Sequence, residues 1–385
     1  MNTLKFGNGE WYGKKDTILA YNDLNSNYKP LPFNFSRASK ATVVNKDGLI
    51  EEVGSGEPRI DYKDDSKGAL LLEPSRSNLA IQSSIENMSG SSSNTGVVEF
   101  GNLNNGLESA EITVNGQRQW YFSTANIVSG TEYTVSFYVD SFDLSSSIRP
   151  IFYIPTEGTN GVSSIYGSQI VLGRNEKTFT ATANGSQFRI GLGTSSNDTG
   201  SIKIGAVQIE EGSYPTSAIF TSGSAVTRVA DSCSQTVPDG VIGQTEGTVL
   251  VEFVNKINNE SGGYNMLFTI YDSSNQNIYV AKRNPTGIEI NAGTGAYTYL
   301  PNGIFDVEGK TYKMAIGYKQ DDFVVYINGV QIWSESSGTI PFSNANNFSL
   351  GSYYDQSLKF NSKINKSSIY NTRLSNSELA ALTQV

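Results

Sequence analysis

The sequence predicts an all-β protein, in which antiparallel jelly-roll or β-sandwich domains follow one another, with an extended N-terminal arm and a short C-terminal helix. Runs such as TEYTVSFYV (131–139) and GTVLVEFV (247–254) alternate or cluster β-branched and aromatic residues between Gly, Asn and Ser. Four dipeptides lie between strand-like runs and suit the positive φ angles of type I′ turns: Asp47-Gly48, Asn115-Gly116, Asn184-Gly185 and Asn328-Gly329.

Composition narrows the classes of function. A chain of 385 residues predicts two or three domains, and its 38 Gly, 21 Tyr and 18 Phe are typical of turn-rich β-structure. The absence of His excludes Ser-His-Asp and Cys-His sites and His-ligated zinc. Cys233 is the single cysteine, so an internal disulfide is excluded. A net charge of −9 opposes binding to nucleic acid and to anionic membranes.

Four segments are expected in order along the chain. Residues 1–34 show little alternation and several Asn, Tyr and Pro positions, which predicts an arm or an extended segment docked onto something else, with a disordered tail as the alternative. Residues 35–82 form a small β-module that contains the strand 69–73, and residues 83–232 form a jelly roll that ends in a strap. Residues 233–385 form the last β-domain, where Ser375 and Glu378 match a capping box before a short helix.

Three blocks of sequence carry a resemblance. FNFSRASKATVVNKDGLIEEVGSGEPRIDY (33–62) with GALLLEPSRSNLAIQSS (68–84) resembles a module near the N-terminus of many bacteriophage virion proteins. VQIEEGSYPTSAIFTSGSAVTRVADSCS (207–234) resembles the closing strand and exit strap of the carbohydrate-binding-like jelly roll that follows it in such proteins. YKMAIGYKQDDFVVYINGVQIW (312–333), FSLGS (348–352) and IYNTRLSNSELAALT (369–383) are similar to a concanavalin A-like, laminin-G-like sandwich.

The resemblance implies a non-enzymatic component of a phage virion, a tail or head fibre or a decoration, that projects from the particle and contacts host-surface glycans. It implies a homo-oligomer, with a trimer as the first expectation, and attachment to capsid or tail proteins through the arm at residues 1–34. The N-terminus lacks a basic stretch followed by an apolar run, so we expect assembly in the host cytoplasm, without membrane insertion.

Catalytic residues are not expected. Retaining hydrolysis needs two carboxylates about 5–5.5 Å apart, and the Glu-x-Asp-x-x-Glu spacing of concanavalin A-like glucanases does not occur in this sequence. Neighbouring acids such as Glu210-Glu211 point to opposite faces of a strand. A virion-associated polysaccharide depolymerase, a host-encoded surface lectin and a decoration without a ligand stay open as alternatives. No cofactor is expected; a structural Ca²⁺ near 271–277 or Asp321-Asp322 is the alternative.

Glycan binding needs exposed aromatic faces beside amides or carboxylates. Tyr353 and Tyr354 are the best candidates, because Asp355 and Gln356 follow them directly in a Gly/Ser loop. Core packing is the more frequent role for aromatic residues of this kind. The further candidates are Trp120 and Tyr121, beside the Asn115-Gly116 turn, and Trp333, after the Asn328-Gly329 turn.

A second group of candidates is structural. Three arginines recur with two acids in the small β-module, which has little apolar sequence of its own. Bidentate Arg–carboxylate pairs could lock its strands together. These candidates are Arg37, Arg59, Asp61, Glu73 and Arg76.

Overall fold

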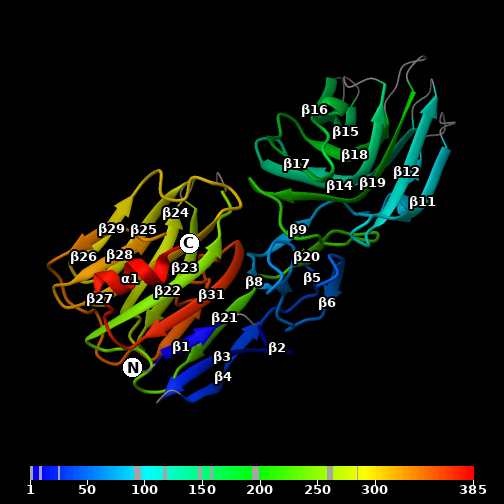
Figure 1. Ribbon diagram of the computed structural model, residues 1–385. Coiled ribbons are helices and arrows are strands. Elements are labelled where there is room, and N and C mark those ends of the chain that lie inside the picture. Colours follow the sequence, from blue (N-terminus) through cyan, green and yellow to red (C-terminus); the bar gives the residue numbers. More distant parts are fainter. Residues whose placement is uncertain are drawn as a thin grey trace. The chain divides into compact units, whose positions relative to one another are not determined.

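A computed structural model gives the structure of the chain, and it divides into two compact units (Figure 1). Unit 1 comprises Met1–Lys46, Val53–Pro74 and Val229–Val385, and unit 2 comprises Asp47–Glu52 and Ser75–Arg228. Nearly all regular structure is β, which confirms the predicted fold class. The residues described are 3–7, 11–24, 27–90, 97–115, 119–145, 150–156, 159–192, 199–257, 263–283 and 285–385.

Helices are scarce, and no helix among these residues has the length and apolar character that a membrane span requires.

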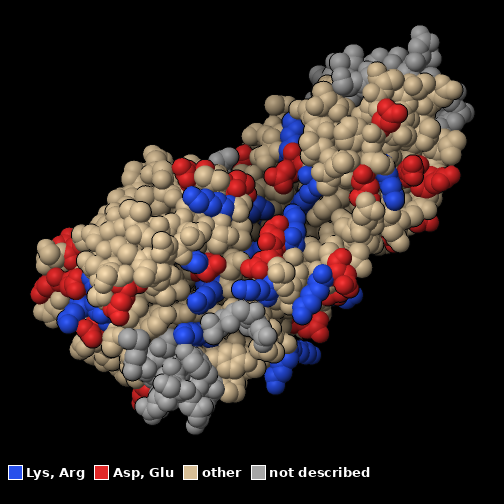
Figure 2. Space-filling view, in the orientation of Figure 1, with Lys and Arg blue, Asp and Glu red and all other residues tan. Residues whose placement is uncertain are grey.

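Charges are mixed on the surface. On the face shown in Figure 2, Lys and Arg side chains lie among Asp and Glu side chains within each unit. The net negative charge is therefore not gathered into one acidic patch on that face.

Unit 1 contains two layers of antiparallel strands. Their inward side chains, among them Val251, Ile278 and Phe348, are fully buried and belong to one hydrophobic core. Hydrogen-bonded neighbours follow one another in this order. The first layer is β29 (Val330–Glu335), β28 (Phe323–Ile327), β27 (Thr311–Lys319), β22 (Glu246–Val254) and β31 (Ser362–Tyr370); the second is β21 (Ser232–Thr236), β30 (Asn347–Leu350), β23 (Tyr264–Tyr271), β24 (Asn277–Arg283), β25 (Gly287–Gly293) and β26 (Ala296–Leu300).

The N-terminal residues belong to this sandwich, where the sequence had suggested a separate arm. They form β1 (Thr3–Phe6), β2 (Gly13–Lys14), β3 (Thr17–Leu24) and β4 (Asn27–Ser36). β1 pairs with β31 and β3, β3 pairs with β4, and β4 pairs with β21. The blue strands beside the red β31 in Figure 1 therefore connect one layer of unit 1 to the other.

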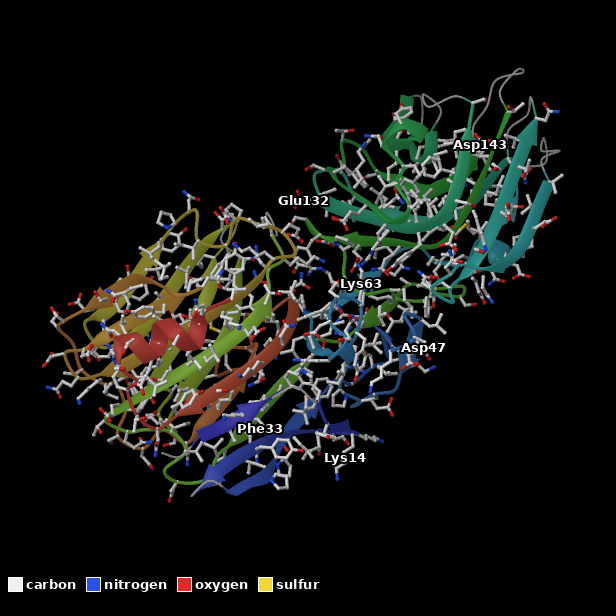
Figure 3. The ribbon with its side chains drawn as sticks, in the orientation of Figure 1. Lys14, Phe33, Asp47, Lys63, Glu132 and Asp143 are labelled. Carbon is white, nitrogen blue, oxygen red and sulfur yellow. The ribbon has the colours of Figure 1, made fainter. Side chains whose placement is uncertain are left out.

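Burial explains why these strands are part of the core. Leu4, Phe6 and Phe33 have no exposed surface. The ring of Phe6 meets that of Phe33 edge-on at 4.5 Å between centroids, and both rings lie about 6 Å from Phe348 of β30. Figure 3 labels Phe33 on β4. The apolar alternation in β3 is short and is followed directly by Asn22 and Asp23, so periodicity alone does not predict this strand.

The small β-module predicted at 35–82 is divided between the units. β5 (Ala41–Val44) and β6 (Ile50–Val53) form a two-stranded sheet around the predicted Asp47-Gly48 turn. β7 (Ile60–Asp61) and β8 (Ala69–Leu72) extend unit 1, because β8 pairs with β31. β9 (Arg76–Asn78) belongs to unit 2, where it pairs with β20 (Val226–Arg228).

Unit 2 is a sandwich of two five-stranded antiparallel sheets. Phe137, Phe152 and Phe188 stack in its core, with ring centroids about 6 Å apart. Figure 3 labels Glu132 and Asp143, which lie near the two ends of one strand of this unit. The first sheet is β10 (Ser89–Gly90), β13 (Gln119–Ile127), β18 (Gly185–Leu192), β15 (Pro150–Thr156) and β16 (Thr159–Tyr166); the second is β11 (Val97–Asn102), β12 (Glu108–Asn115), β19 (Thr199–Glu211), β14 (Glu132–Leu144) and β17 (Gly173–Thr180).

Two of the predicted turns do not connect paired strands. Asn184-Gly185 lies between β17 and β18, which belong to different sheets. The Asn115-Gly116 turn lies partly outside the described residues, and the strands on either side of it, β12 and β13, also belong to different sheets. Asn328-Gly329 does connect the paired strands β28 and β29. A turn dipeptide predicts a reversal of the chain but cannot show which sheet receives the next strand.

The predicted C-terminal helix is present as α1 (Asn376–Thr383). Ser375 Oγ accepts a hydrogen bond from Glu378 N, and Glu378 Oε2 accepts one from Ser375 N at 2.7 Å, as a capping box requires. Leu379 is fully buried in a small apolar cluster with Ala315 of β27 and Val324 of β28. The helix therefore covers the outer side of the first layer of unit 1.

The position of β1 predicts a large effect of Phe6→Ala. Removing a fully buried phenyl ring should lower the free energy of unfolding of unit 1 by about 3–5 kcal/mol. Urea unfolding followed by fluorescence in a Trp120→Phe background measures this, because the two remaining tryptophans, Trp11 and Trp333, lie in unit 1. Tyr12→Ala, at a side chain 47% exposed in the same segment, is the control. Equal stability of both variants would contradict the placement of β1 in the core.

Candidate functional site

A surface of aromatic and polar side chains covers the outer side of β24, β25 and β26. Residues of β25 alternate, so Ile288 and Ile290 enter the core while Glu289 and Asn291 lie on the other side of the sheet. Strand register then places Asn291 between Tyr279 and Tyr297, and Glu289 beside Tyr299. We call this surface the tyrosine face. Its residues are Tyr264, Tyr279, Arg283, Glu289, Asn291, Tyr297, Tyr299, Tyr353 and Tyr354.

Tyr353 and Tyr354 join the tyrosine face from the loop after β30. Their ring centroids are 4.4 Å apart, and the ring of Tyr353 meets that of Tyr279 edge-on at 5.4 Å. Hydrogen bonds fix the loop, because Tyr353 N donates to Ser357 O at 3.0 Å and Thr269 Oγ1 donates to Ser352 O at 3.0 Å. Both tyrosines are half-buried, so each ring presents one part of its surface to solvent.

Glu289 organises the polar groups of this surface. Its carboxylate accepts hydrogen bonds from the Tyr279 hydroxyl at 2.7 Å and from Arg283 Nη1. The Arg283 guanidinium also lies 3.8 Å from the ring centroid of Tyr264 and 5.0 Å from that of Tyr299. Burial, and next the hydrogen bond to Glu289, raise the pKa of Tyr279 well above its ordinary value, so its hydroxyl keeps its proton.

Tyr297 and Tyr299 are the open part of the tyrosine face. They lie two residues apart on β26, on the same side of the strand, and are 56% and 42% exposed. Partial desolvation and the neighbouring Glu289 carboxylate raise the pKa of Tyr297, which keeps this phenol neutral as well. Nearby, Asn291 Nδ2 donates to Asn277 Oδ1 at 3.2 Å, and Asn277 Nδ2 donates to the Tyr353 hydroxyl at 3.4 Å. Exposed rings therefore adjoin an ordered set of donors and acceptors.

The other aromatic candidates lie elsewhere. Trp120 and Tyr121 are on β13 of unit 2, only 6% and 8% exposed, so neither offers the open ring face that was expected. Trp333 on β29 is half-buried and packs against the core of unit 1. The polar neighbours of Tyr353 and Tyr354 are engaged in the loop, since Asp355 Oδ1 accepts from Ser357 N at 2.9 Å and Gln356 Nε2 donates to Ser349 Oγ at 3.1 Å.

Sequence reasoning missed the open part of the site. The segment AYTYL (296–300) places two aromatic residues at i and i+2, and GIEINAG (287–293) alternates apolar with polar residues. Each pattern marks a strand with one solvent-facing side. A search for tyrosines at this spacing beside alternating Glu and Asn would have found Tyr297 and Tyr299.

The structural arginines form a buried ionic cluster in unit 1. Arg59 Nη1 lies 2.6 Å from Glu73 Oε2, and its Nη2 bonds Asp231 Oδ2. Arg37 Nη1 lies 3.1 Å from Asp231 Oδ1, and Arg37 Nη2 donates to Gly54 O at 2.6 Å. Burial, the largest influence, lowers the pKa of Arg59, but the charges of Asp231 and Glu73 together raise it above its ordinary value. The buried guanidinium groups and carboxylates are therefore paired with one another inside unit 1.

The sequence did not identify Asp231, and two of its candidates lie outside the ionic cluster. Asp61 pairs instead with Lys363 Nζ, at 2.8 Å. Arg76 is in unit 2, where its guanidinium lies 4.7 Å from the ring centroid of Tyr214. Asp231 is distant in sequence from its partners, so only the fold could reveal its role.

Neither calcium candidate, at 271–277 or at Asp321-Asp322, brings three acidic side chains together. Among the residues that the structure describes, His, Cys, Asp and Glu do not come together in any group of three that could hold a metal ion. Asp272 Oδ1 accepts hydrogen bonds from Ser274 N and Gln276 N, at 2.8 and 3.0 Å, and so closes its own turn. Asp322 pairs with Arg373 at 2.8 Å.

One family model matches part of the chain. Residues 230–380 match the concanavalin A-like lectin/glucanases superfamily. This part of the chain is therefore similar to concanavalin A-like domains. It contains the strands and the loop of the tyrosine face, and the match confirms the resemblance of this segment to that fold. A search of the curated proteins gave no match.

Solved structures that match include carbohydrate-binding modules and sialidases. The CBM40 of Ruminococcus gnavus IT-sialidase, bound to α2,3 sialyllactose, is 18% identical over 37% of this chain and 84% of that chain, with a TM-score of 0.31. Domain 4 of AbnA, a GH43 extracellular arabinanase from Geobacillus stearothermophilus, in complex with arabinotriose, is 20% identical over 40% and 73%, also at 0.31. Trypanosoma rangeli sialidase with the inhibitor DANA is 10% identical over 95% and 66%, at 0.31.

These matches correct the expectation of a non-enzymatic protein. Enzymes are among the matched structures, and the Trypanosoma rangeli sialidase matches extend over 95% of this chain. A TM-score near 0.31 carries no argument for a reaction, so none is assigned. The family match supports a lectin-like fold of the kind that binds carbohydrate.

The ionic cluster predicts that Arg59→Met strongly destabilises unit 1. This change removes the guanidinium that pairs with both Glu73 and Asp231, and breaking a buried pair costs about 3–5 kcal/mol. Urea unfolding of the Trp120→Phe protein measures the loss. The control is Lys319→Ala, which removes the exposed pair with Glu246 and should cost less than about 1 kcal/mol. Similar small losses for both variants would show that the cluster does not hold unit 1 together.

Proposed function

We propose that the tyrosine face is a glycan-binding surface. The observation that carries the proposal is the pair of exposed rings, Tyr297 and Tyr299, beside Glu289 and Arg283 on one side of a lectin-like domain. The C–H groups of a sugar ring pack on an aromatic face, and its hydroxyls exchange hydrogen bonds with amides, phenols and carboxylates. The tyrosine face offers each of these groups within a few residues.

The arrangement of the face favours an oligosaccharide over a single sugar. Neighbouring strands lie about 4.8 Å apart, so the rows from β24 to β26 extend across roughly 10 Å. The rings of Tyr353 and Tyr354 continue the aromatic surface beyond Tyr279. Several sugar units can therefore contact the face at once.

The polar side chains beside the exposed rings are held in place before any ligand binds. Tyr279 is hydrogen-bonded to Glu289, and Arg283 is held by Glu289 and by the ring of Tyr264. Side chains that already occupy their bound positions lose little conformational entropy on binding, which favours affinity. Arg283 and Glu289 also neutralise each other, so the face suits neutral sugars.

Alanine at the exposed rings tests this proposal. Tyr297→Ala and Tyr299→Ala should each lower the affinity for a glycan selected on an array by about 3- to 10-fold, because each removes one stacking surface. Isothermal titration of the full chain measures the change. Tyr166→Ala, at a tyrosine 41% exposed in unit 2, should leave the affinity unchanged. A double variant at Tyr297 and Tyr299 that binds the selected glycan as the wild type does would refute the proposal.

We further propose that this surface acts on a phage particle. The resemblance of residues 33–84 and 207–234 to modules of virion proteins supports a fibre or decoration that presents the tyrosine face to host-surface glycans. The protein would assemble in the host cytoplasm as a homo-oligomer, with a trimer as the first expectation. Because β1–β4 are part of unit 1, attachment to other virion proteins would use the outer surface of these strands.

The virion role predicts a fixed number of copies in each particle. Quantitative mass spectrometry of gradient-purified particles from the source measures the ratio of this chain to the major capsid protein. A constant ratio across preparations is expected. Absence of the chain from particles that are infectious would contradict the virion role and leave the glycan-binding proposal standing.

A further inference from the structure

Unit 2 contains a pocket that the tyrosine face does not involve. Its volume is about 420 Å³, which lies within the range of small-molecule sites. Side chains of several segments line it, among them Ser84, Leu107, Glu108 and Phe220. All of its lining residues belong to unit 2. The pocket is therefore complete within one compact unit.

A β-bulge shapes one wall of this pocket. Opposite β14, the register of β19 shifts between Ser136↔Gln208 and Tyr138↔Gly205, which leaves Ala206 and Val207 opposite the single residue Phe137. Ala206 has a φ of 54°, in the left-handed region that residues other than glycine seldom adopt, and it lines the pocket. Bulges of this kind redirect the chain next to binding sites. The chain thus departs from regular β-structure at the wall of the pocket.

Ser84 brings a buried hydroxyl to the wall of the pocket. The residue is only 8% exposed, and its Oγ has no hydrogen-bond partner among the described residues. It stands before the short helix η1 (Ile85–Asn87) and does not cap it. The neighbouring Ser83 Oγ, in contrast, accepts from Thr221 N at 3.0 Å. A buried hydroxyl without a partner is costly, so a ligand that bonds Ser84 would gain more than an exposed group could offer.

The remaining lining groups define the class of ligand. Phe220 is 36% exposed and offers a ring face, and Leu107 adds apolar surface. Asn87 and Glu108 are exposed and bring an amide and a carboxylate. The lining contains neither Lys nor Arg, so an anionic ligand would face the Glu108 carboxylate without a compensating cation.

We propose that this pocket binds a neutral mono- or disaccharide. One face of the sugar ring packs on Phe220, one hydroxyl bonds Ser84 Oγ, and further hydroxyls bond Asn87 and Glu108. This site lies in the unit that does not contain the tyrosine face, and the proposal stands independently of that surface. The chain thereby has a small pocket for a sugar end or branch as well as an open face for a longer glycan.

Methyl NMR of the full chain tests the pocket directly. Ile50 and Leu107 line it, and their methyl resonances report on its occupancy. The probes are glucose, galactose, mannose, N-acetylglucosamine, lactose, cellobiose and maltose, each titrated to 50 mM. At least one should shift both residues in a saturable way, and N-acetylneuraminic acid should not. The proposal would be overturned if no neutral sugar shifted these resonances, or if N-acetylneuraminic acid alone did.

Matched variants separate the pocket from general effects of mutation. Phe220→Ala and Ser84→Ala should each lower the affinity for the sugar, measured from the saturable shift, at least 5-fold. Their controls are Phe142→Ala, at a ring 38% exposed in the same unit, and Ser109→Ala, at a buried serine whose Oγ also lacks a partner among the described residues but does not line the pocket. Equal weakening by the controls would overturn the assignment. Tyr297→Ala should leave these shifts unchanged, so failure of the tyrosine face and failure of the pocket give different results.

Discussion

The buried ionic cluster of Arg37, Arg59, Glu73 and Asp231 holds unit 1 together where its chain is interrupted. The longer of the two stretches outside unit 1 runs from Ser75 to Arg228, so Glu73 and Asp231 lie beside its two ends. Glu73 N donates to Asp231 Oδ2 at 2.9 Å, and Asp231 N donates to Glu73 O at 3.0 Å. Buried charges are stable only when they are paired and hydrogen-bonded, so this cluster fixes both segments in one arrangement. The strands that follow Asp231 can then build the two layers of unit 1.

Local patterns predicted the local features of this protein. Alternating aromatic and β-branched residues predicted the strands, and Ser375 with Glu378 predicted the cap of α1. The arginines of the small module were selected correctly in part, because Arg37 and Arg59 do form buried ion pairs. Each of these signals lies within a few residues, which is the range over which side-chain periodicity and capping act.

Features that depend on distant residues could not be predicted. Asp231 joins Arg37 and Arg59 only in the folded chain, and β1 finds its partner β31 at the other end of the sequence. The tyrosine face is a property of adjacent strands, because Tyr279 and Tyr297 are brought to either side of Asn291 by register. Which side chains meet at the site depends on how the strands pair, and the sequence of each strand alone does not show this. The same limit explains why Trp120 and Tyr121 were selected as surface residues and are buried.

Tyrosine-selective NMR of the full chain tests the central claim most directly. The protein is labelled with ¹³C on tyrosine rings, and the oligosaccharide that binds best on an array is titrated into it. Binding at the tyrosine face predicts saturable shifts of Tyr297, Tyr299 and Tyr353, with Tyr12 and Tyr166 unchanged. An oligosaccharide that binds and leaves Tyr297 and Tyr299 unperturbed would contradict the account.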